Sequence, residues 1–338
     1  MDYAAAESEQ TLRVGPLVNL ALILRSLDCE PDPVFHATGF HASEFVDPDH
    51  RINFAQASQL LKRCVEITGC DHLGLILGEQ SCPSHLGIAG FLLKTASTVE
   101  VALQSLVDNL DLHDNGGIVS LDVGPNFTSL QYALYKTDTV AREQIYDLSA
   151  AVMFQIMRMI CGKKWRPESI SIERRKPGDV KPYKRFFGTQ IYFDATESAM
   201  TFSNDWLKHV PPTADLLLFQ HLQKEADYLH QQQNHDVMDV LPVVLRRALL
   251  TERFSTREIA DELGLHERSL HRRLRAAGTS FRQQLDAARK SASEELLENT
   301  ALPISEIAIA LGYADSSGFI RAFQRWSGTS PASWREHS

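Results

Sequence analysis

The sequence lacks the features that would place it in a membrane or in the common enzyme classes. It is 43% hydrophobic, yet none of its apolar runs approaches the roughly 18 residues that a transmembrane helix needs. It also has no CxxC pair, no GxSxG motif and no phosphate-binding glycine loop. His266, Glu267 and His271 come near a zinc-protease motif, but with one residue too many between the histidines. We therefore expect no membrane segment, no catalytic residues, no metal site and no cofactor.

Cysteine is scarce, and its spacing is neither paired nor of a metal-binding type. An odd number of scattered thiols fits a reducing compartment. The first ten residues are polar and acidic and predict no signal peptide. Both observations indicate a cytoplasmic protein whose thiols are buried or incidental. The five cysteines are Cys29, Cys64, Cys70, Cys82 and Cys161.

Basic charge is in deficit overall, but the deficit is confined to one part of the chain. The net charge is −9; residues 241–338 hold 14 basic and 12 acidic side chains, whereas residues 1–240 hold 20 and 31. This asymmetry is typical of a DNA-reading end attached to a domain that does not touch phosphate. The length of 338 residues also predicts about two domains.

The last hundred residues contain one short pattern twice. Glu258-Ile259-Ala260-x-x-Leu263-Gly264 returns as Glu306-Ile307-Ala308-x-x-Leu311-Gly312. Each copy continues into a second helical run, and both runs end at a Gly-Thr-Ser sequence. An internal repeat of this kind indicates one supersecondary unit used twice.

Each copy predicts two helices joined by a tight turn. In the first copy Leu270 and Leu274 form an apolar stripe on the second helix, which leaves its arginines outside. In the second copy the stripe is Phe319, Ala322, Phe323 and Trp326. A pair of short helices whose second member has a polar and basic outer face is the helix-turn-helix arrangement.

A single copy would fit an ordinary helical hairpin with a solvated basic face equally well, and the duplication favours the DNA-binding interpretation. Between the copies, residues 281–299 carry a helical period without proline or glycine. A helix of about 17 residues is about 25 Å long. With the widths of the flanking units added, two recognition helices would lie about 34 Å apart, which is one turn of B-DNA.

At these residues the chain resembles the AraC/XylS family of bacterial transcription regulators, over about residues 240 to 336. The second copy carries most of the resemblance, and the first copy and the connecting helix add to it. The matching residues are Ile304-Ser305-Glu306-Ile307-Ala308, Leu311-Gly312-Tyr313, Asp315-Ser316, Phe319, Arg321-Ala322-Phe323, Gly328-Thr329-Ser330-Pro331 and Arg335, together with Arg268, Leu270, Arg272, Leu274, Gly278, Arg289 and Ala292.

The resemblance implies which side chains read DNA, because in such families each recognition helix enters the major groove. The side chains expected to contact bases are Arg268, His271, Arg272, Ser316, Ser317, Ile320 and Arg321. Those expected to contact phosphates are Arg275, Gln324 and Arg325. An arginine that bonds a guanine edge contributes about 1 to 3 kcal/mol of discrimination. Ile320 departs from the polar residue common at its position and could offer only apolar contact, such as to a thymine methyl.

The upstream region predicts a mixed α+β domain. Helices are expected at about 18–27, 54–67, 99–110 and 139–160, the third with a capping box from Ser97 to Glu100. Strands are expected at 118–123 and 128–134, joined as a hairpin, and around 170–172, 190–193 and 200–202. The chain turns polar from Gln220 to Asp236, and a last helix follows at about 237–249.

These patterns predict three segments. Residues 1–219 form an effector-sensing and dimerisation domain, and residues 220–238 form a linker. Residues 239–338 form an all-α DNA-binding domain with helix-turn-helix motifs at about 255–276 and 304–326.

The upstream domain resembles the sensor domains described as arabinose-binding-like. The phrases that carry this resemblance are Leu73-Gly74-Leu75-x-Leu77-Gly78, Leu86-Gly87-Ile88-Ala89-Gly90-Phe91 and Phe193-Asp194. The resemblance implies a small-molecule effector of unknown identity, since relatives respond to chemically diverse compounds. His85 and His113 are possible polar groups of a pocket, although a loop histidine is more often solvated, and Gly87 and Gly90 suit a turn or close packing. The effector-binding residues stay unassigned.

The prediction is a ligand-responsive DNA-binding transcription regulator, and not an enzyme. By the resemblance we expect an activator that works as a homodimer with promoter DNA, an effector and RNA polymerase as partners. DNA-repair proteins that combine this DNA-binding unit with a Pro-Cys-His-Arg nucleophile do not match, because the proline-flanked thiol here is Ser81-Cys82-Pro83. The alternative is an architectural DNA-binding protein without effector control, for which we expect a small and basic chain.

Overall fold

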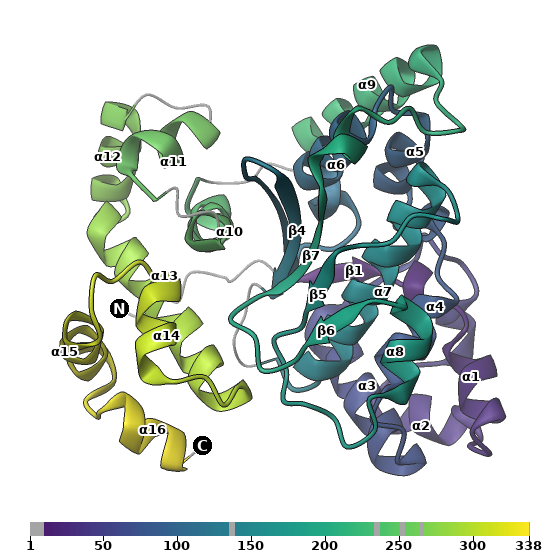
Figure 1. The fold of residues 1–338 in the computed structure, drawn as a ribbon, viewed down its shortest axis with the longest axis horizontal. Coiled ribbons are helices and arrows are strands. Elements are labelled where there is room, and N and C mark those ends of the chain that lie inside the picture. Colours follow the sequence, from purple (N-terminus) through teal and green to yellow (C-terminus); the bar gives the residue numbers. More distant parts are fainter. Residues whose placement is uncertain (1–9, 135–138, 233–236, 251–253, 264–266, 338) are drawn as a thin grey trace.

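The chain folds into a mixed α/β part followed by a helical part (Figure 1). The computed structural model describes residues 10–134, 139–232, 237–250, 254–263 and 267–337. The two parts lie side by side, and β4 is the labelled strand that faces the helical part (Figure 1). This arrangement confirms the predicted α+β domain followed by an all-α domain.

The N-terminal part contains a five-stranded sheet of strand order β3-β4-β7-β5-β6 and a two-stranded sheet of β1 and β2. All pairings are antiparallel except that of β5 with β6, which is parallel. The strands are β1 (Thr11–Arg13), β2 (Arg51–Asn53), β3 (Gly117–Val123), β4 (Phe127–Leu134), β5 (Ser169–Ser171), β6 (Gln190–Tyr192) and β7 (Ser198–Ser203).

Helices cover both ends of this sheet and make up the C-terminal part. In the N-terminal part they are α1 (Leu20–Ser26), α2 (Pro31–Ala37), α3 (Phe54–Thr68), α4 (Leu73–Glu79), α5 (Ile88–Thr95), α6 (Val99–Asn109), α7 (Arg142–Cys161), α8 (Lys181–Phe187) and α9 (Leu216–Gln232). Short 3-10 turns span Gly15–Leu17, Ala42–Phe45, Pro83–Leu86, Leu110–Leu112 and Asn204–Lys208. In the C-terminal part they are α10 (Val237–Leu250), α11 (Thr256–Glu262), α12 (Glu267–Ala276), α13 (Phe281–Asn299), α14 (Ile304–Ala310), α15 (Ser316–Ser327) and α16 (Pro331–His337).

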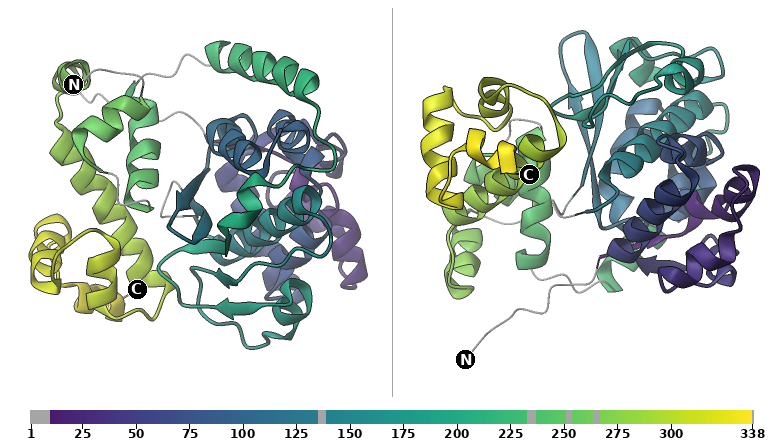
Figure 2. Two further views of the ribbon diagram at one scale, coloured as in Figure 1. Left: turned by 45° about the horizontal axis from the view of Figure 1, so that its top comes forward. Right: turned by 90° about the horizontal axis from the view of Figure 1, so that it is seen from below.

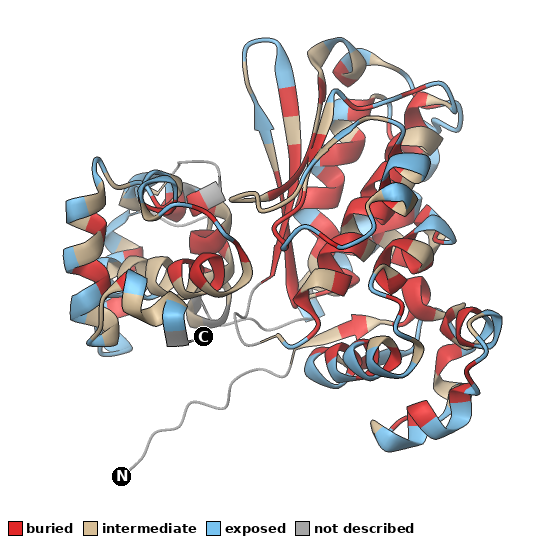
Figure 3. Ribbon diagram, turned by 60° about the horizontal axis from the view of Figure 1, so that its bottom comes forward, coloured by how far each residue is buried: buried red, intermediate tan, exposed pale blue. Residues whose placement is uncertain are grey.

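The predicted hairpin is the β3–β4 ribbon, with Val123 opposite Thr128 next to the turn. Its outer end is exposed, while its base is buried on successive residues instead of on alternate ones (Figure 3). The reason is that helices cover both faces of the base: α6 and α7 contact the ribbon from one side, and α10 of the C-terminal part contacts β3 and β4 from the other (Figures 1 and 2). The ribbon therefore connects the two parts of the molecule.

Two of the predicted helix ends can be compared in detail. Helix α3 ends at Gly69, whose φ of 66° is the left-handed conformation expected there. Helix α6 begins at Val99, as expected, but its N-cap is Thr98 and not Ser97, because the Thr98 hydroxyl accepts a hydrogen bond from the Val101 N–H (3.2 Å). The expected capping box from Ser97 to Glu100 is therefore wrong.

Most of the predicted linker is helical. Residues 220–232 belong to α9, which packs on α5 and buries Ala226 against Leu92 and Leu112. The polar composition of this segment reflects its single buried stripe, since one apolar face is enough to fix a surface helix. Residues 220–232 of the predicted linker are thus helical and packed on the N-terminal part. Residues 233–236 lie outside the described residues, and the predicted domain boundaries remain predictions.

Two glycines of α4 set its distance from the central helix α7. A Cβ on Gly74 would lie 2.0 Å from the Gln144 carbonyl oxygen, and one on Gly78 would lie 2.4 Å from the Ala151 Cβ. No atoms tolerate such separations, so α4 packs against α7 only where these side chains are absent.

We expect Gly74→Ala to lower the free energy of unfolding by about 1 to 3 kcal/mol, because the added methyl group must push two backbones apart. Urea denaturation followed by circular dichroism measures the change. Gly178→Ala is the matched control, since a Cβ there meets nothing within 4 Å. Equal stability of the two variants would contradict the packing argument.

Candidate DNA interface

The first helix-turn-helix unit begins with a reciprocal cap. The Glu258 N–H donates to Ser255 Oγ (3.3 Å), and the Ser255 N–H donates to Glu258 Oε2 (3.1 Å). This cap fixes the start of α11 at Thr256, and the cap residue Ser255 directly follows Phe254 in the sequence. The expected turn residue Gly264 lies outside the described residues.

The buried stripe of this unit is the predicted one. Leu270 and Leu274 of α12 are fully buried, and they pack with α11 against helix α10. The remaining core residues are Ile259, Ala260, Leu241, Val244, Leu245 and Ala248. The arginines of α12 consequently lie on its outer face.

The second unit repeats this arrangement with clearer turn geometry. Gly312 follows α14 with a φ of 74°, and a Cβ there would meet the Phe254 ring at 2.7 Å. Asp315 then caps α15 by accepting a hydrogen bond from the Gly318 N–H (2.7 Å). Phe319 and Phe323 are fully buried, as predicted, and Gly328 ends the helix with a φ of 77°.

Helix α13 joins the units, and Arg289 on it holds the second turn in place. Its Nε donates to the Leu311 carbonyl oxygen (3.1 Å), and its guanidinium lies 5.0 Å from the ring centres of both Phe254 and Tyr313. Leu285 packs against the cores of both units. The two recognition helices are thus fixed to one helix of 19 residues.

Helices α12 and α15 lie on the side of the C-terminal part that faces away from the sheet (Figure 1). Eight of the ten predicted DNA-contacting residues are exposed, and seven of these are Arg268, His271, Arg272, Arg275, Arg321, Gln324 and Arg325. Ser317 is exposed as well, whereas Ser316 and Ile320 are partly buried. The structure therefore brings these residues to two outward helix faces, and their contacts with bases or phosphates remain predictions.

Arg268, His271 and Arg325 each have an interaction partner within the protein. Arg325 Nη2 lies 3.0 Å from Asp286 Oδ2 of α13, and His271 Nε2 lies 3.9 Å from Glu267 Oε1 one turn earlier. Both pairs are exposed, and such pairs contribute little to stability. Among the described residues, Arg272 and Arg321 have no ion-pair or hydrogen-bond partner, so their guanidinium groups are available to a ligand.

A buried ionic cluster joins the DNA-binding part to the N-terminal part. The Glu295 carboxylate of α13 is fully buried and pairs with Arg142 of α7 and with Arg246 of α10. The Tyr146 hydroxyl donates to Glu295 Oε1 (2.6 Å), and Glu173 Oε1 lies 3.6 Å from Arg142 Nη2. We name these five side chains the interdomain cluster.

Burial perturbs the titration of several groups in the interdomain cluster. It raises the pKa of Glu173 to about 7 and that of Tyr146 to about 12, and it lowers the pKa of Arg246. Around the cluster, Arg175 Nη2 donates to the Glu298 carbonyl oxygen (3.3 Å), and the Ala301 N–H donates to Asp194 Oδ1 (3.3 Å). The contact between the two parts is therefore specific in charge and geometry.

The interdomain cluster was not predicted, although the sequence contains one sign of it, a charged residue in an apolar stripe. Glu295 follows Ala292 at a spacing of three on α13, which places a charge within the apolar stripe. A carboxylate at such a position needs a buried cationic partner. Sequence alone cannot say that one such partner is Arg142, in a helix of the other part of the molecule.

Comparison with known families assigns both parts of the chain. Residues 29–210 match the family described as the arabinose-binding domain of AraC transcription regulators, and residues 259–337 match a helix-turn-helix domain family. The chain belongs to the AraC family. It is a helix-turn-helix transcription regulator with an arabinose-binding-type sensor domain, as the resemblance implied.

Similar AraC-family proteins span nearly the same length. The ornithine utilization regulator of Pseudomonas aeruginosa is 26% identical over 90% of both chains, and the transcriptional regulator VirS of Mycobacterium tuberculosis is 22% identical over 93% of both. A crystal structure of the regulator CdpR from Pseudomonas aeruginosa covers 93% of this chain and 98% of its own, with 24% identity and a TM-score of 0.44. Within the part of the chain that the structure describes, no helix is both long and apolar enough to cross a membrane.

We expect Arg272→Ala in this AraC-family protein to relax base preference at one position of the DNA site by about 1 to 3 kcal/mol, because a bidentate contact with one base edge is lost. Binding to a randomised DNA library measures the preference at every position. Arg273→Ala is the control, since Arg273 is exposed on the same helix but is not among the predicted base readers. A uniform loss across all sequences would make Arg272 a phosphate contact.

The contrasting variant is Arg325→Ala, which should weaken binding to all sequences alike and reduce the salt slope of log affinity by about 1. Asp286→Ala sharpens this test, because it removes the carboxylate that pairs with Arg325. It should leave base preference unchanged and strengthen binding slightly. A changed base preference in either variant would contradict the phosphate assignment.

Proposed function

We propose that this AraC-family protein is a cytoplasmic activator that binds promoter DNA through α12 and α15, recruits RNA polymerase and responds to a small-molecule effector. The observation that carries the proposal is the pairing of two outward recognition helices with a separate sensor domain. Helix α13 has 19 residues and is about 28 Å long, which supports two contacts about one turn of B-DNA apart.

Catalysis has no part in the proposal. The similar proteins named above are regulators. In addition, burial raises the pKa of Cys64 and of Cys161 to about 12, and it also raises the pKa of Cys70. Thiols of this kind are poor nucleophiles at neutral pH. An architectural role is also less well supported, because most of the chain forms a folded part with an acidic excess.

The interdomain cluster supplies the route by which the sensor would influence DNA binding. Arg142 and Tyr146 are in the first turns of α7, and they hold Glu295 of the helix that joins both DNA-binding units. A displacement of α7 would therefore move α13 with it. We propose that effector binding acts through this contact.

A homodimer is part of the proposal, and α9 is the candidate surface. At the start of α9 Leu217 is 72% exposed and Leu216 is 59% exposed, and Tyr228, about three turns further along the helix, is 55% exposed. Apolar side chains gathered on one exposed helix are typical of a protein interface. Two copies paired in this way would present four recognition helices.

Sequencing of genomic fragments retained by the purified full-length protein tests the function. We expect a motif with two blocks about 10 base pairs apart, because each recognition helix reads one major-groove segment. The binding is carried out at near-physiological salt, where non-specific contacts are weak. Recovery of fragments without a common motif would support the architectural role instead.

Glu295→Gln tests the proposed route between the domains. It removes the buried carboxylate that pairs with both Arg142 and Arg246 and leaves only Glu173 near them among the described acidic side chains of the cluster. Breaking a buried pair in this way costs about 3 to 5 kcal/mol. We expect the domains to separate, measured as an increased radius of gyration in small-angle X-ray scattering, with unchanged base preference. Glu294→Gln is the control, because Glu294 pairs only with Lys290 on the same helix among the described residues. An unchanged radius in Glu295→Gln would contradict the role of the cluster.

A further inference from the structure

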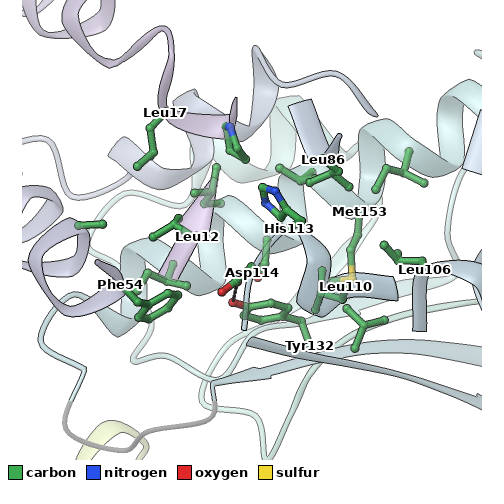
Figure 4. A pocket seen from close by; sticks show the side chains of 18 of the residues that line it. Leu12, Leu17, Phe54, Leu86, Leu106, Leu110, His113, Asp114, Tyr132 and Met153 are labelled. Atoms are coloured by element: carbon green, nitrogen blue, oxygen red, sulfur yellow. Dashed lines mark hydrogen bonds between the residues drawn. The ribbon is translucent and has the colours of Figure 1, made fainter. Parts of the chain in front are cut away.

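The N-terminal part encloses a cavity of about 80 Å³ between α3, α6, α7 and the β3–β4 ribbon (Figure 4). Its lining is mostly leucine, isoleucine, valine, methionine and phenylalanine side chains. Among them Leu12, Leu106, Leu110 and Met153 surround His113 in the close-up view (Figure 4). A concave apolar site with a few polar groups is the usual form of a small-molecule pocket.

Most polar groups of the lining already have partners. The Tyr132 hydroxyl donates to Asp114 Oδ2 (3.1 Å), and Asp114 Oδ1 accepts a hydrogen bond from the Gly116 N–H (2.7 Å). Ser58 Oγ accepts a hydrogen bond from the Ala141 N–H (3.1 Å), and Ser149 Oγ donates to the Tyr146 carbonyl oxygen (3.1 Å). These groups need nothing from a ligand.

His113 is the exception. Its side chain is buried, with 5% of the residue exposed, and its Nδ1 has no hydrogen-bond partner among the described residues. An unpaired buried ring nitrogen is costly, about 1 to 3 kcal/mol, and each such group in a folded protein calls for an explanation. The expectation that this histidine is merely solvated is therefore wrong.

The charges around the cavity restrict what it can hold. Burial lowers the pKa of His113 to about 3, so its ring is neutral at physiological pH, and burial raises the pKa of Asp114 to about 6. Among the described residues that line the cavity there is no lysine or arginine; Arg13 and Arg51 lie near enough to lower the pKa of His113 further but do not line the cavity. The Asp114 oxygens already accept hydrogen bonds from the Tyr132 hydroxyl and the Gly116 N–H, and an ammonium group would in addition lose its hydration in this mostly apolar cavity.

We propose that this cavity is the effector site, and that it takes a small neutral molecule, mostly hydrocarbon, whose one hydroxyl or carbonyl group hydrogen-bonds to His113. Zwitterionic amino acids and anionic sugars do not fit this lining. At roughly 10 to 15 Å³ for each water-sized group, the cavity has room for about five to eight non-hydrogen atoms. The inference rests on the proposed effector control, and it names the chemistry of the effector.

The position of the cavity suits a sensor. Tyr132 lines it and meets the Tyr146 ring edge-on, with 6.3 Å between the ring centres. Tyr146 belongs to the interdomain cluster, where it bonds Glu295. An occupant thus touches a residue that is only one contact away from the cluster.

Titration with 1-hexanol tests the proposal, with hexanoate and hexylammonium as an anionic and a cationic probe of similar chain length. The full-length protein is labelled with ¹³C at its methionine methyl groups, because Met153 lines the cavity and reports its occupancy directly. Met153→Leu assigns that resonance. We expect 1-hexanol to shift it saturably, and hexanoate and hexylammonium to bind at least about tenfold more weakly. Absence of a shift with 1-hexanol, or tighter binding of either ion, would overturn the proposal.

His113→Leu should weaken 1-hexanol binding about tenfold, which corresponds to the loss of one hydrogen bond. His113→Gln, which keeps a hydrogen-bonding group, should restore most of it. His72→Leu is the control, because His72 is a half-buried histidine outside the cavity. Unchanged binding in His113→Leu would overturn the role of His113, and the charge series on the unsubstituted protein decides the ligand class if that variant does not fold.

These results separate the two levels of inference. Motif-specific DNA binding without any response of Met153 would refute the cavity assignment and leave the regulator intact. Saturable binding of 1-hexanol to a protein that retains DNA without a motif would refute the regulator and leave the cavity assignment standing.

Discussion

Helix α7 is the element on which the rest of the molecule depends. It is 20 residues long, 14 of them are buried, and it contacts α4, the sheet and α3. Its first turns carry Arg142 and Tyr146 to the DNA-binding part, while its middle turns line the cavity through Val152, Met153 and Ile156. Because a packed helix moves as a unit, a displacement of one end of α7 also displaces the other end. The sensor cavity and the interdomain cluster therefore share one rigid body.

Buried charges on α7 favour one arrangement of its neighbours over others. Besides the interdomain cluster, Asp147 pairs with Arg174 and accepts a hydrogen bond from the Tyr183 hydroxyl (2.6 Å). Burial of such groups costs desolvation energy that their pairing only partly offsets, so they add little net stability. What they add is geometry, since a rotation of α7 would leave each charge without its partner. The position of α7 relative to α13 is consequently well defined.

The parts of this architecture that local sequence patterns can encode were the parts predicted. Leu270, Leu274, Phe319 and Phe323 repeat at helical spacing, and glycine or Asp-Ser sequences mark the turns, so both helix-turn-helix units followed from the sequence. The N-terminal hairpin followed in the same way from two strand-forming runs, 118–123 and 128–134, separated by turn residues. The DNA contacts of the two recognition helices were inferred from the family resemblance and remain predictions.

The parts that depend on distant contacts were missed. Helix α9 has a polar composition, and only its contact with Leu92 explains why it is ordered as a helix on α5. Glu295 and Arg142 are ordinary helix residues in the sequence, and their pairing exists only in the folded chain. His113 lies in a segment with turn-like residues, which predicted exposure, but α6 and the ribbon close over it. Burial in each case is a property of the tertiary structure and not of the local segment.

The binding free energy that a small effector can supply limits how it can act. A molecule of five to eight non-hydrogen atoms binds with at most about 1.5 kcal/mol for each atom, and usually with much less. It can shift the protein between two arrangements only by the difference of its affinities for them, whereas reversing a 1:99 equilibrium needs about 5.5 kcal/mol. Breaking the buried pairs of Glu295 would cost about as much again. A small effector can therefore act only on arrangements of nearly equal free energy, and these are arrangements in which Glu295 keeps both arginines and the two domains stay joined.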